Sequence, residues 1–509
     1  MSTERLVVIG NGMAGARTVE EILAAERSLA PTLASGPERF EITVFGDEPY
    51  GNYNRILLSS VLSGDHEPGG IFLNPVTWYE ENGITLHCGD RVSRIDREQR
   101  VVVSASGRQV PYDRLIIATG SRAFVPDIDG LRGEDGASKS GIFAFRNLDD
   151  CRRIAGYAGK CRRAVVIGGG LLGLEAAYGL RGYGIEVQVV HQASHLMNRQ
   201  LDAPAAGTLR ARIEQLGIGV LLNRRTSEVL GDEAVTGLRF DDGETLECDM
   251  VVFACGIQPN VELGQESGLE VERAIIVDDQ LRTSDPAIYS VGECTQHRGE
   301  LYGLVAPLWE QAQVLAHHLT GLRPNAAYRG SKTASRLKVM GLEVASMGLI
   351  EPELESDEVV LFHEPKRGIY KKLVIRDDRL VGAIVLGDGL RAPLLMQLFD
   401  RSTPLPQERA SLLFDLGGAP AAVTPEAMAD DAPVCHCNGV TKGDIRECVA
   451  GGGCSLQAVM RATRAGTGCG SCKGLVRVLV ERLRPAGTAE TNVSAEAPAS
   501  ADIPLGVLR

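Results

Sequence analysis

The sequence predicts an α/β protein built around two separate parallel sheets, and two similar segments carry this prediction. The first, RLVVIGNGMAG at residues 5–15, is a short β-branched run followed by glycines and then by the helical composition of ARTVEEILAAE. The second, RAVVIGGGLLGLEAAYGL at residues 163–180, repeats this order of strand, glycine-rich turn and helix. Each segment therefore predicts a β–α unit with a tight turn at its centre.

The glycine spacing in both turns is G-x-G-x-x-G, which is typical of a dinucleotide-binding turn. The first glycine permits the tight turn, the second lets the backbone approach a pyrophosphate, and the third lets the helix pack close to the strand. Two complete fingerprints about 158 residues apart predict two Rossmann-like units and two bound nucleotides. The glycines are Gly10, Gly12 and Gly15 in the first turn and Gly168, Gly170 and Gly173 in the second.

The strand that follows each of these helices should offer a group to the ribose of the nucleotide. EITVFGDEP ends in two acids, of which Glu48 is predicted to bind a ribose hydroxyl, although the loop RSLAPTLASGPERF makes the spacing longer than usual. In the second unit EVQVVHQAS ends at His191, where an NAD-specific fold usually has Asp or Glu, and no arginine follows directly to receive a 2′-phosphate. The second motif alone leaves NADH and NADPH open.

Length, charge and hydropathy narrow the class of protein further. The 509 residues suffice for three or four domains of about 150 residues each. A net charge of -13 gives no electrostatic reason to bind nucleic acid or an anionic membrane. No apolar run approaches the roughly 18 residues of a membrane span, and MSTERLVVIGNG lacks the basic flank and cleavage site of a secretory signal. We expect a cytoplasmic protein whose partners are small molecules and proteins, without nucleic acid or membrane.

Cysteines are concentrated near the C-terminal end, where six of the twelve fall within 435–472. In a reducing compartment this density favours metal binding or redox chemistry over disulfides. The pattern C-x-C followed by C-x-x-C suits structural zinc or a 2Fe–2S cluster. The spacing is uncommon among zinc fingers, and the glycines of GTGCGSC let backbone N–H groups surround sulfur, so the cluster is favoured and zinc is the alternative. The predicted ligands are Cys435, Cys437, Cys469 and Cys472, whereas Cys448, Cys454 and the six scattered cysteines are expected to be core or surface thiols.

Three further segments, LIIATGS, VVFACGIQPN and TSDPAIYSVGEC, resemble signatures of the two-dinucleotide-domain flavoprotein disulfide reductase superfamily. Together with the fingerprints they cover residues 1 to about 325 in the expected order. The resemblance implies FAD in the first Rossmann unit and a nicotinamide nucleotide in the second unit, which is inserted into the first. The region from Pro49 to Leu62 contains no cysteine, so no redox-active disulfide is expected beside the flavin.

The resemblance also implies individual contacts with the flavin. Glu293, which closes the VGEC motif, would bond the ribityl chain, although Asp is commoner there. Arg55, in the segment GNYNRILLSS, would lie near FAD as in rubredoxin and ferredoxin reductases. Thr119, Gly120 and Gly292 belong to the same signature motifs and are predicted cofactor contacts.

For two further positions the resemblance implies a cofactor role, and an ordinary structural role is the alternative. Glu175, beside the third glycine of the second turn, would hold the nicotinamide carboxamide in the related reductases, or be a helix-surface acid. Trp309, in APLWEQAQ, lies in a segment that resembles the helix facing the N1–C2 edge of the flavin, or it is a core aromatic.

The remaining chain resembles two smaller modules. The β-rich runs after residue 325, such as YKKLVIRDDRLVGAIVLGD, resemble the α+β interface domain of these reductases, which is often a dimer surface, so a homodimer is expected. The segment that starts PVCHCNGV resembles a bacterioferritin-associated-ferredoxin-like 2Fe–2S domain in which all four cysteines are ligands. There, Thr441 with Asp444 predicts a helix cap, and KGLVRVLVERL has an apolar face at helical spacing.

These predictions describe a flavoprotein that has a small helical cluster domain near its C-terminal end. The expected parts are an FAD-binding domain (1–125 and 250–325), an NAD(P)-binding domain (126–249), an interface domain (326–416), a linker (417–433), a 2Fe–2S domain (434–484) and a disordered tail (485–509).

This architecture resembles the FAD-containing half of NAD(P)H-dependent assimilatory nitrite reductases and the electron-transfer subunit of bacterial assimilatory nitrate reductases, up to about residue 484. The resemblance implies an NADH-dependent oxidoreductase without acid–base catalytic residues, which passes electrons through FAD and the cluster to a molybdenum nitrate reductase subunit. The alternatives are a reductase component for a nitrite reductase or another ferredoxin-like acceptor, and a non-catalytic redox sensor.

Reduction of nitrite by this chain itself is not expected. The siroheme half of the nitrite reductases that it resembles holds a 4Fe–4S cluster through C-x5-C and C-x3-C, and no cysteine pair here has the second spacing. The 25 residues after Arg484 are too few and too polar to enclose a macrocycle.

Overall fold

The computed structural model describes residues 3–29, 39–133, 136, 138–414, 428–435, 437–468, 470 and 472–484. The chain divides into two compact units, Met1–Ala419 and Pro420–Arg509. The predicted tail and most of the predicted linker, residues 417–427, lie outside the described residues. Within the described ranges, no helix is both long and apolar enough to cross a lipid bilayer.

The first unit contains a five-stranded sheet that is parallel throughout. Its strands in spatial order are β21 (Ile288–Ser290), β9 (Arg114–Ile117), β1 (Glu4–Ile9), β2 (Phe40–Phe45) and β5 (Thr85–His87). The last four residues of the central strand β1 are buried, as expected for a strand that is covered on both faces.

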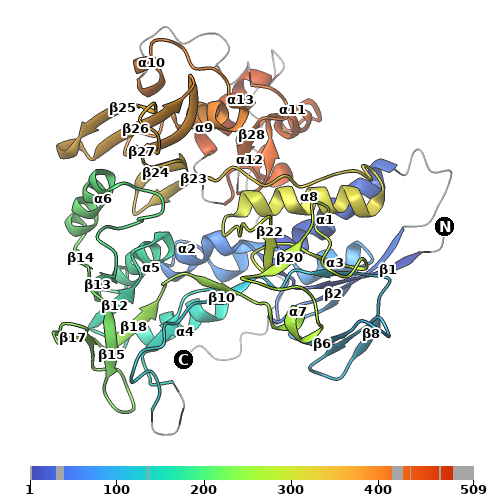
Figure 1. Ribbon diagram of the computed structural model, residues 1–509, viewed down its shortest axis with the longest axis horizontal. Coiled ribbons are helices and arrows are strands. Elements are labelled where there is room, and N and C mark those ends of the chain that lie inside the picture. The colour runs from blue at the N-terminus through green and yellow to red at the C-terminus, as the bar shows by residue number, and fades with distance from the viewer. Residues whose placement is uncertain are drawn as a thin grey trace. The chain divides into compact units, whose positions relative to one another are not determined.

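Two helices cover one face of this sheet, and a small antiparallel sheet covers the other. The helices α1 (Met13–Leu29) and α8 (Val305–Thr320) lie side by side and share one apolar core with the strands (Figure 1). The small sheet consists of β6 (Val92–Asp96), β7 (Val101–Ser104) and β8 (Gln109–Pro111), near the short helix α7 (Glu262–Glu266).

A second parallel sheet repeats this construction. Its strands in spatial order are β11 (Ile142–Ala144), β18 (Met250–Phe253), β12 (Arg163–Ile167), β13 (Glu186–His191) and β14 (Ile218–Leu222). The helices of this sheet are α4 (Leu148–Ala158), α5 (Leu171–Arg181) and α6 (Ala203–Gln215), and its small antiparallel sheet is β15 (Thr226–Leu230), β16 (Gly237–Phe240) and β17 (Thr245–Glu247).

The second sheet is an insertion between two strands of the first. The chain leaves β9 through β10 (Ser121–Ala123) and returns through β19 (Ile257–Pro259) before it reaches β21. The outgoing and returning strands pair antiparallel, with Ser121 opposite Pro259. This arrangement confirms the α/β fold with two parallel sheets that the two glycine turns predicted.

Short elements complete the surroundings of the first sheet. They are β3 (Asn52–Tyr53), a 3-10 turn at Arg55–Leu57, α2 (Leu58–Leu62), a 3-10 turn at Pro68–Ile71, β4 (Phe72–Asn74), α3 (Val76–Glu81), β20 (Ile275–Val277) and β22 (Thr295–His297). Leu58 and Leu62 of α2 pack against the core of the second sheet, so this helix joins the two sheets.

The last part of the first unit is an antiparallel sheet with helices on one face. The strands in spatial order are β23 (Ala334–Val339), β24 (Leu342–Gly348), β27 (Arg379–Leu386), β26 (Ile369–Arg376) and β25 (Glu358–Glu364). The helices α9 (Ala392–Arg401) and α10 (Ala410–Leu413) cover one face, and the other face packs on α6.

The second unit is small and mainly helical. A two-stranded hairpin, β28 (Pro433–Cys435) and β29 (Val440–Thr441), is followed by α11 (Lys442–Ala450), α12 (Leu456–Thr463) and α13 (Lys473–Leu483). The predicted helix cap is present, because Thr441 and Asp444 form a reciprocal capping box at the start of α11. The predicted apolar face of α13 is also confirmed, because Val476, Leu479 and Val480 are buried.

Candidate functional site

A cleft of about 560 Å³ opens at the carboxyl ends of the strands of the first sheet. Parallel α/β sheets bind ligands at this edge, and ligand sites commonly measure about 300–1,000 Å³. Residues that follow four different strands line the cleft, and most of the predicted flavin contacts are among them: Gly10 and Gly12 after β1, Glu48 after β2, Thr119 and Gly120 after β9, and Glu293 after β21.

The first glycine turn has the shape that a phosphate site requires. Gly10 has φ +116°, and an added Cβ would overlap the carbonyl oxygen of Ala118. A Cβ on Gly15 would overlap the carbonyl oxygen of Gly10, so only glycine lets α1 begin this close to β1. A Cβ on Gly12 would meet nothing within 4 Å, so the turn leaves open space before the N-terminus of α1.

The second glycine turn repeats this geometry at the start of α5. Gly168 has φ +129° and approaches the carbonyl of Ala254, and Gly173 packs on the carbonyl of Gly168. A Cβ on Gly170 would again meet nothing within 4 Å. Both turns therefore fit a pyrophosphate approaching a helix N-terminus.

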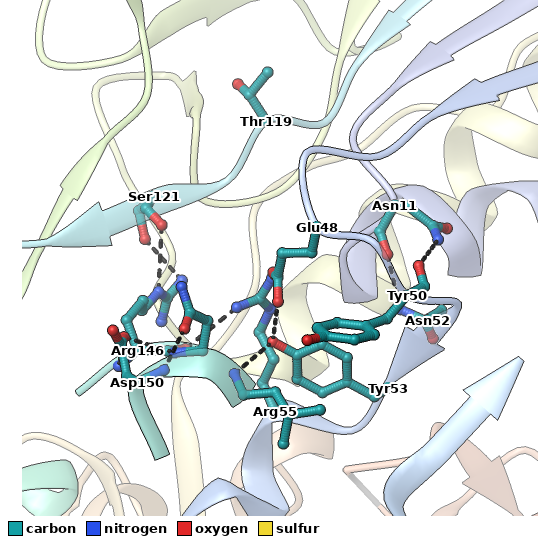
Figure 2. A network of polar contacts seen from close by, with 12 residues as sticks. Asn11, Glu48, Tyr50, Asn52, Tyr53, Arg55, Thr119, Ser121, Arg146 and Asp150 are labelled. Atoms are coloured by element: carbon teal, nitrogen blue, oxygen red, sulfur yellow. Dashed lines mark hydrogen bonds and ion pairs between the residues drawn. The ribbon is translucent and has the colours of Figure 1, made fainter. Parts of the chain in front are cut away.

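Asn11, between the first two glycines, fixes the first turn through hydrogen bonds to its neighbours. Its side-chain oxygen accepts from the Tyr79 hydroxyl, and its backbone oxygen accepts from Asn52 Nδ2 at 3.2 Å. Tyr79 is fully buried, and burial raises the pKa of its hydroxyl, which therefore stays a donor at neutral pH. Asn11, Tyr50 and Asn52 lie together beside the cleft in Figure 2.

Glu48 is held by two side chains of the segment that follows it. It forms an ion pair with Arg55 and accepts a hydrogen bond from the Tyr53 hydroxyl at 2.7 Å (Figure 2). About a fifth of the Glu48 side chain and a quarter of the Arg55 side chain remain exposed, at 22% and 26%. Both predicted residues therefore line the same part of the cleft, and the acid is already neutralised there.

Arg146 is the main residue of the cleft that the sequence did not reveal. It follows β11 of the second sheet, and its guanidinium forms an ion pair with Glu293 and donates to Ser121 Oγ at 2.8 Å. Its backbone carbonyl accepts from Arg55 Nη1 at 3.2 Å. Figure 2 shows Arg146 beside Ser121, and the side chain of Arg55 extends toward Arg146.

The polar groups of the cleft thus form one continuous network across the two sheets. Tyr53 donates to Glu48 and accepts from the backbone N–H of Leu148, the first residue of α4, at 3.2 Å. Asp150 accepts from the backbone N–H groups of Arg146 and Asn147, at 2.8 and 3.0 Å, and so orients the loop that carries Arg146.

The remaining predicted flavin contacts have structural partners as well. Thr119 Oγ1 donates to the carbonyl of Asn260 at 3.0 Å, and Asn260 Nδ2 donates back to the carbonyl of Thr119 at 2.8 Å. Gly292 has φ +93°, and its N–H donates to Gln311 Oε1 on α8 at 2.9 Å. These bonds fix the strand ends from which Gly120 and Glu293 face the cleft.

Trp309 and Glu175 do not line this cleft. Trp309 is buried in the core between α1 and α8, with the Arg17 guanidinium 5.4 Å from its ring centre. The neighbouring Leu308 lines the cleft instead. Glu175 lies half-buried on α5, close to the second glycine turn. The cofactor roles of both residues stay predictions.

His191, at the end of β13, is engaged with the second glycine turn. Its Nδ1 accepts a hydrogen bond from the backbone N–H of Gly169 at 3.2 Å. Burial lowers the pKa of the imidazole below its ordinary value, so the ring is neutral at pH 7.

A second hollow, of about 680 Å³, surrounds Asp279 and contains none of the predicted site residues. The Asp279 carboxylate accepts from His297 Nε2 at 2.9 Å, Arg298 Nη2 at 2.8 Å and Arg329 Nη1 at 3.0 Å. Hydrogen bonds from Arg298 and His297 lower the pKa of Asp279 to about 2. Arg298 and Arg329 both form ion pairs with this acid. The charged groups of the hollow therefore form a structural ion-pair cluster.

The second unit brings three of the four predicted cysteine ligands together. The Sγ atoms of Cys435 and Cys437 are 3.6 Å apart, and the thiol of Cys472 also interacts with Cys435. Hydrogen bonds from both thiols and from backbone N–H groups lower the pKa of Cys435 far below that of a free thiol. Cys469 lies outside the described residues, which by themselves do not complete a metal site.

Four of the scattered cysteines have the opposite character. Burial raises the pKa of Cys151 and Cys248 to about 12 and that of Cys161 and Cys255 to about 11. Thiols that stay protonated at neutral pH are poor nucleophiles and poor metal ligands. The chemistry of the donor set therefore distinguishes Cys435 and its neighbours as candidate ligands for iron or zinc.

Three family models match consecutive parts of the chain. A model described as pyridine nucleotide-disulphide oxidoreductase matches residues 4–314, which is more than half of the chain. A model described as rubredoxin NAD+ reductase C-terminal domain matches residues 334–403, and one described as BFD-like 2Fe-2S binding domain matches residues 433–482.

Relatives and solved structures agree with these matches. A nitrite reductase NAD(P)H of Bacillus subtilis is 44% identical over 483 residues, which are 94% of this chain and 58% of that protein. An assimilatory nitrate reductase electron transfer subunit of the same organism is 39% identical over 495 residues, which are 96% of this chain and 62% of that protein. The chain thus spans about three fifths of the length of these relatives. A ferredoxin reductase structure from Rhodopseudomonas palustris has 27% identity and a TM-score of 0.70, and covers 80% of this chain and 97% of that one.

Proposed function

Because the chain belongs to the pyridine nucleotide-disulphide oxidoreductase family, we propose that it passes electrons from NADH through FAD and a 2Fe–2S cluster to a separate protein acceptor. The acceptor in this proposal is the molybdenum-containing subunit of an assimilatory nitrate reductase. The family assignment makes the chain an NAD(P)H-dependent flavoprotein oxidoreductase.

One observation carries the proposal: a single chain combines two dinucleotide-type turns with a unit in which Cys435, Cys437 and Cys472 lie together. When bound, FAD accepts two electrons as a hydride and releases them singly, which is the chemistry that a one-electron cluster requires. No residue pair in the flavin cleft has to act as a general acid or base for this transfer.

The residues of the cleft have assignable roles in holding FAD. The turn at Gly10, Gly12 and Gly15 would receive the pyrophosphate at the N-terminus of α1, where the open space before Gly12 supports this role. The carboxylate oxygens of Glu48 and Glu293 would accept hydrogen bonds from the hydroxyl groups of the ribose and the ribityl chain. Arg55 and Arg146 would neutralise these two acids, so that the acids do not repel the negatively charged phosphates.

The second turn would receive the nicotinamide nucleotide. Gly168, Gly170 and Gly173 reproduce the geometry of the first turn, and Glu175 would hold the carboxamide. The state of His191 supports NADH over NADPH, because a neutral imidazole engaged with Gly169 offers no positive charge to a 2′-phosphate.

The four cysteines would hold the cluster. Thiolate character at Cys435 suits both iron and zinc, and the match of residues 433–482 to a 2Fe-2S binding domain supports iron. The likeness to a nitrate reductase electron transfer subunit over 96% of this chain supports nitrate reductase as the acceptor.

A second candidate function is that of the reductase component of a nitrite reductase. The 44% identity to a nitrite reductase over 94% of this chain favours it. In that case electrons would pass from the cluster to a siroheme-containing partner or segment, and ammonium would be the product.

The two functions are distinguished by supplying NADH to the anaerobically purified protein with each acceptor in turn. We expect rapid flavin bleaching by NADH, two iron atoms per chain, no ammonium from nitrite, and nitrite from nitrate only when a molybdenum subunit is added. Ammonium formed from nitrite, by this chain alone or with a siroheme-containing partner, and no nitrite formed from nitrate with the molybdenum subunit, would refute the nitrate reductase assignment. Zinc in place of iron would refute the cluster, and a kcat/KM that favours NADPH would refute the choice of nucleotide.

A further inference from the structure

The two cysteine-bearing loops of the second unit are joined by the side chain of one residue, Asn438. This asparagine follows Cys437 in the turn of the β28–β29 hairpin. Its Nδ2 donates to the carbonyl of Arg464 at 2.5 Å and to Thr467 Oγ1 at 3.0 Å. Both acceptors lie between α12 and α13, in the loop that leads to Cys472.

The amide is well placed to act as a tie. Asn438 is only 6% exposed, so its hydrogen bonds do not compete with bulk water. Its two acceptors are themselves linked, because Thr467 Oγ1 donates to the Arg464 carbonyl at 2.8 Å. One side chain thus closes a compact turn in which Arg464 and Gly466 both have positive φ, at +62° and +78°.

The same turn carries a backbone N–H group that interacts with a cysteine thiol. Gly466 lies between the two acceptors of Asn438, and its backbone N–H interacts with the Cys435 thiol. The backbone N–H of Asn438 interacts with the same thiol. Hydrogen bonds to sulfur ligands are among the factors that set the reduction potential of an iron–sulfur cluster.

We propose that Asn438 is a positioning residue for the iron–sulfur cluster, which holds the loop of Cys472 against the loop of Cys435 and aims the Gly466 N–H at the Cys435 sulfur. This inference rests on the proposed function, because it assigns the cysteines to a 2Fe–2S cluster. Asparagine suits the role because its amide nitrogen supplies two hydrogens at once, whereas an aspartate would place a carboxylate against the Arg464 carbonyl.

The test compares Asn438→Ala, Asn438→Asp and Thr467→Val with the unaltered full-length protein. We expect iron to be lost to a chelator about 10-fold faster in Asn438→Ala, because two buried hydrogen bonds are removed. Asn438→Asp should lose it faster still, and Thr467→Val, which removes one of the two acceptors, should lie between Asn438→Ala and the parent. The potential of the remaining cluster should become more negative, because a weaker N–H···S bond stabilises the reduced cluster less.

Ser455→Ala is the matched control. Ser455 caps α12 by accepting from the backbone N–H of Ala458 at 3.1 Å, so the hydrogen bond that its side chain makes lies within α12. Its loss should lower the thermal stability of the second unit and leave the cluster potential unchanged. An Asn438→Ala protein with the parent's potential and iron-release rate would overturn the inference, as would an equal potential shift in Ser455→Ala. A parent protein without a 2Fe–2S absorption spectrum would instead overturn the proposed function.

Discussion

Glu48 and Glu293 each form an ion pair with an arginine in the cleft of the first sheet, and these pairs determine the charge that the cleft presents to a ligand. FAD has a diphosphate, which two unpaired carboxylates would repel. Arg55 and Arg146 neutralise the acids and keep further N–H donors, because a guanidinium has five. The acids can therefore accept hydrogen bonds from hydroxyl groups without repelling the diphosphate from the cleft.

Replacement of Arg146 by Gln should weaken FAD binding by about 10- to 100-fold, the effect of losing charge-assisted hydrogen bonds to Glu293 and Ser121. Flavin release can be followed by the rise of its fluorescence on dilution. Arg163→Gln is the control, because Arg163 pairs with Glu247 on the exposed surface of the second sheet. Equal FAD affinity in the two variants would contradict the role of Arg146.

Replacement of Cys435, Cys437, Cys469 or Cys472 by Ser should remove the iron while FAD and its reduction by NADH remain, because the glycine turns and the cysteines belong to different compact units. Metal analysis and the visible spectrum measure both outcomes. Cys454→Ser, at a thiol outside the predicted ligand set, should keep its iron. Loss of flavin together with iron would show that the two sites depend on each other.

Two neighbouring lysines of strand β26 bind acids on opposite faces of the antiparallel sheet. Lys371 and Lys372 are adjacent and both buried, yet they point to different partners. Lys371 Nζ donates to Asp388 at 2.6 Å on one side, and Lys372 Nζ lies 2.9 Å from Asp202 on the other. Asp202 is the N-cap of α6, so Lys372 ties the antiparallel sheet to a helix of the second parallel sheet.

Replacement of Lys372 by Met should lower the free energy of unfolding of the first unit by about 3 kcal/mol, because the Asp202 carboxylate is left buried without its cation. Denaturant unfolding followed by flavin fluorescence measures this change. Arg367→Met, in the turn between β25 and β26, removes the exposed pair with Glu364 and should cost less than about 1 kcal/mol. Similar losses in both variants would contradict a special role for the buried pair.

In the proposed function, two-electron chemistry and one-electron chemistry take place in two different compact units of the molecule. The turns and the cleft lie within Met1–Ala419, whereas Cys435, Cys437 and Cys472 lie within Pro420–Arg509. Each unit has a buried core of its own, which for the second unit includes Ile445, Val459 and Leu479. Removal of the second unit therefore need not disturb the first.

A chain that ends at Ala419 should keep FAD and reduce a small artificial acceptor with NADH at a rate similar to that of the full chain. It should lose the transfer of electrons to a protein acceptor, because the cysteine unit is absent. Steady-state assays with the two kinds of acceptor measure both activities. The full chain with Cys435 and Cys437 replaced by Ser is the matched control, and retained transfer to the protein acceptor in either variant would exclude the cluster from the route.

The sequence by itself determined the local features. The glycine turns, the strand and helix on either side of each, and the capping box of Thr441 and Asp444 were predictable, because they depend on backbone conformations and periodicities that span a few residues. The cysteine spacing likewise predicted a metal or cluster site, of which one predicted ligand, Cys469, lies outside the described residues.

Only the tertiary structure decided which distant side chains meet. Arg146 and Glu293 are far apart in the chain and belong to different sheets, and no periodicity joins them. Lys372 with Asp202 and Asn438 with Arg464 are likewise pairs whose partners lie in different elements of the fold. Such contacts depend on how whole elements pack, so a short sequence window contains no signal for them. Trp309 shows the same limit, because its place in the core between two helices follows from their packing and not from its own segment.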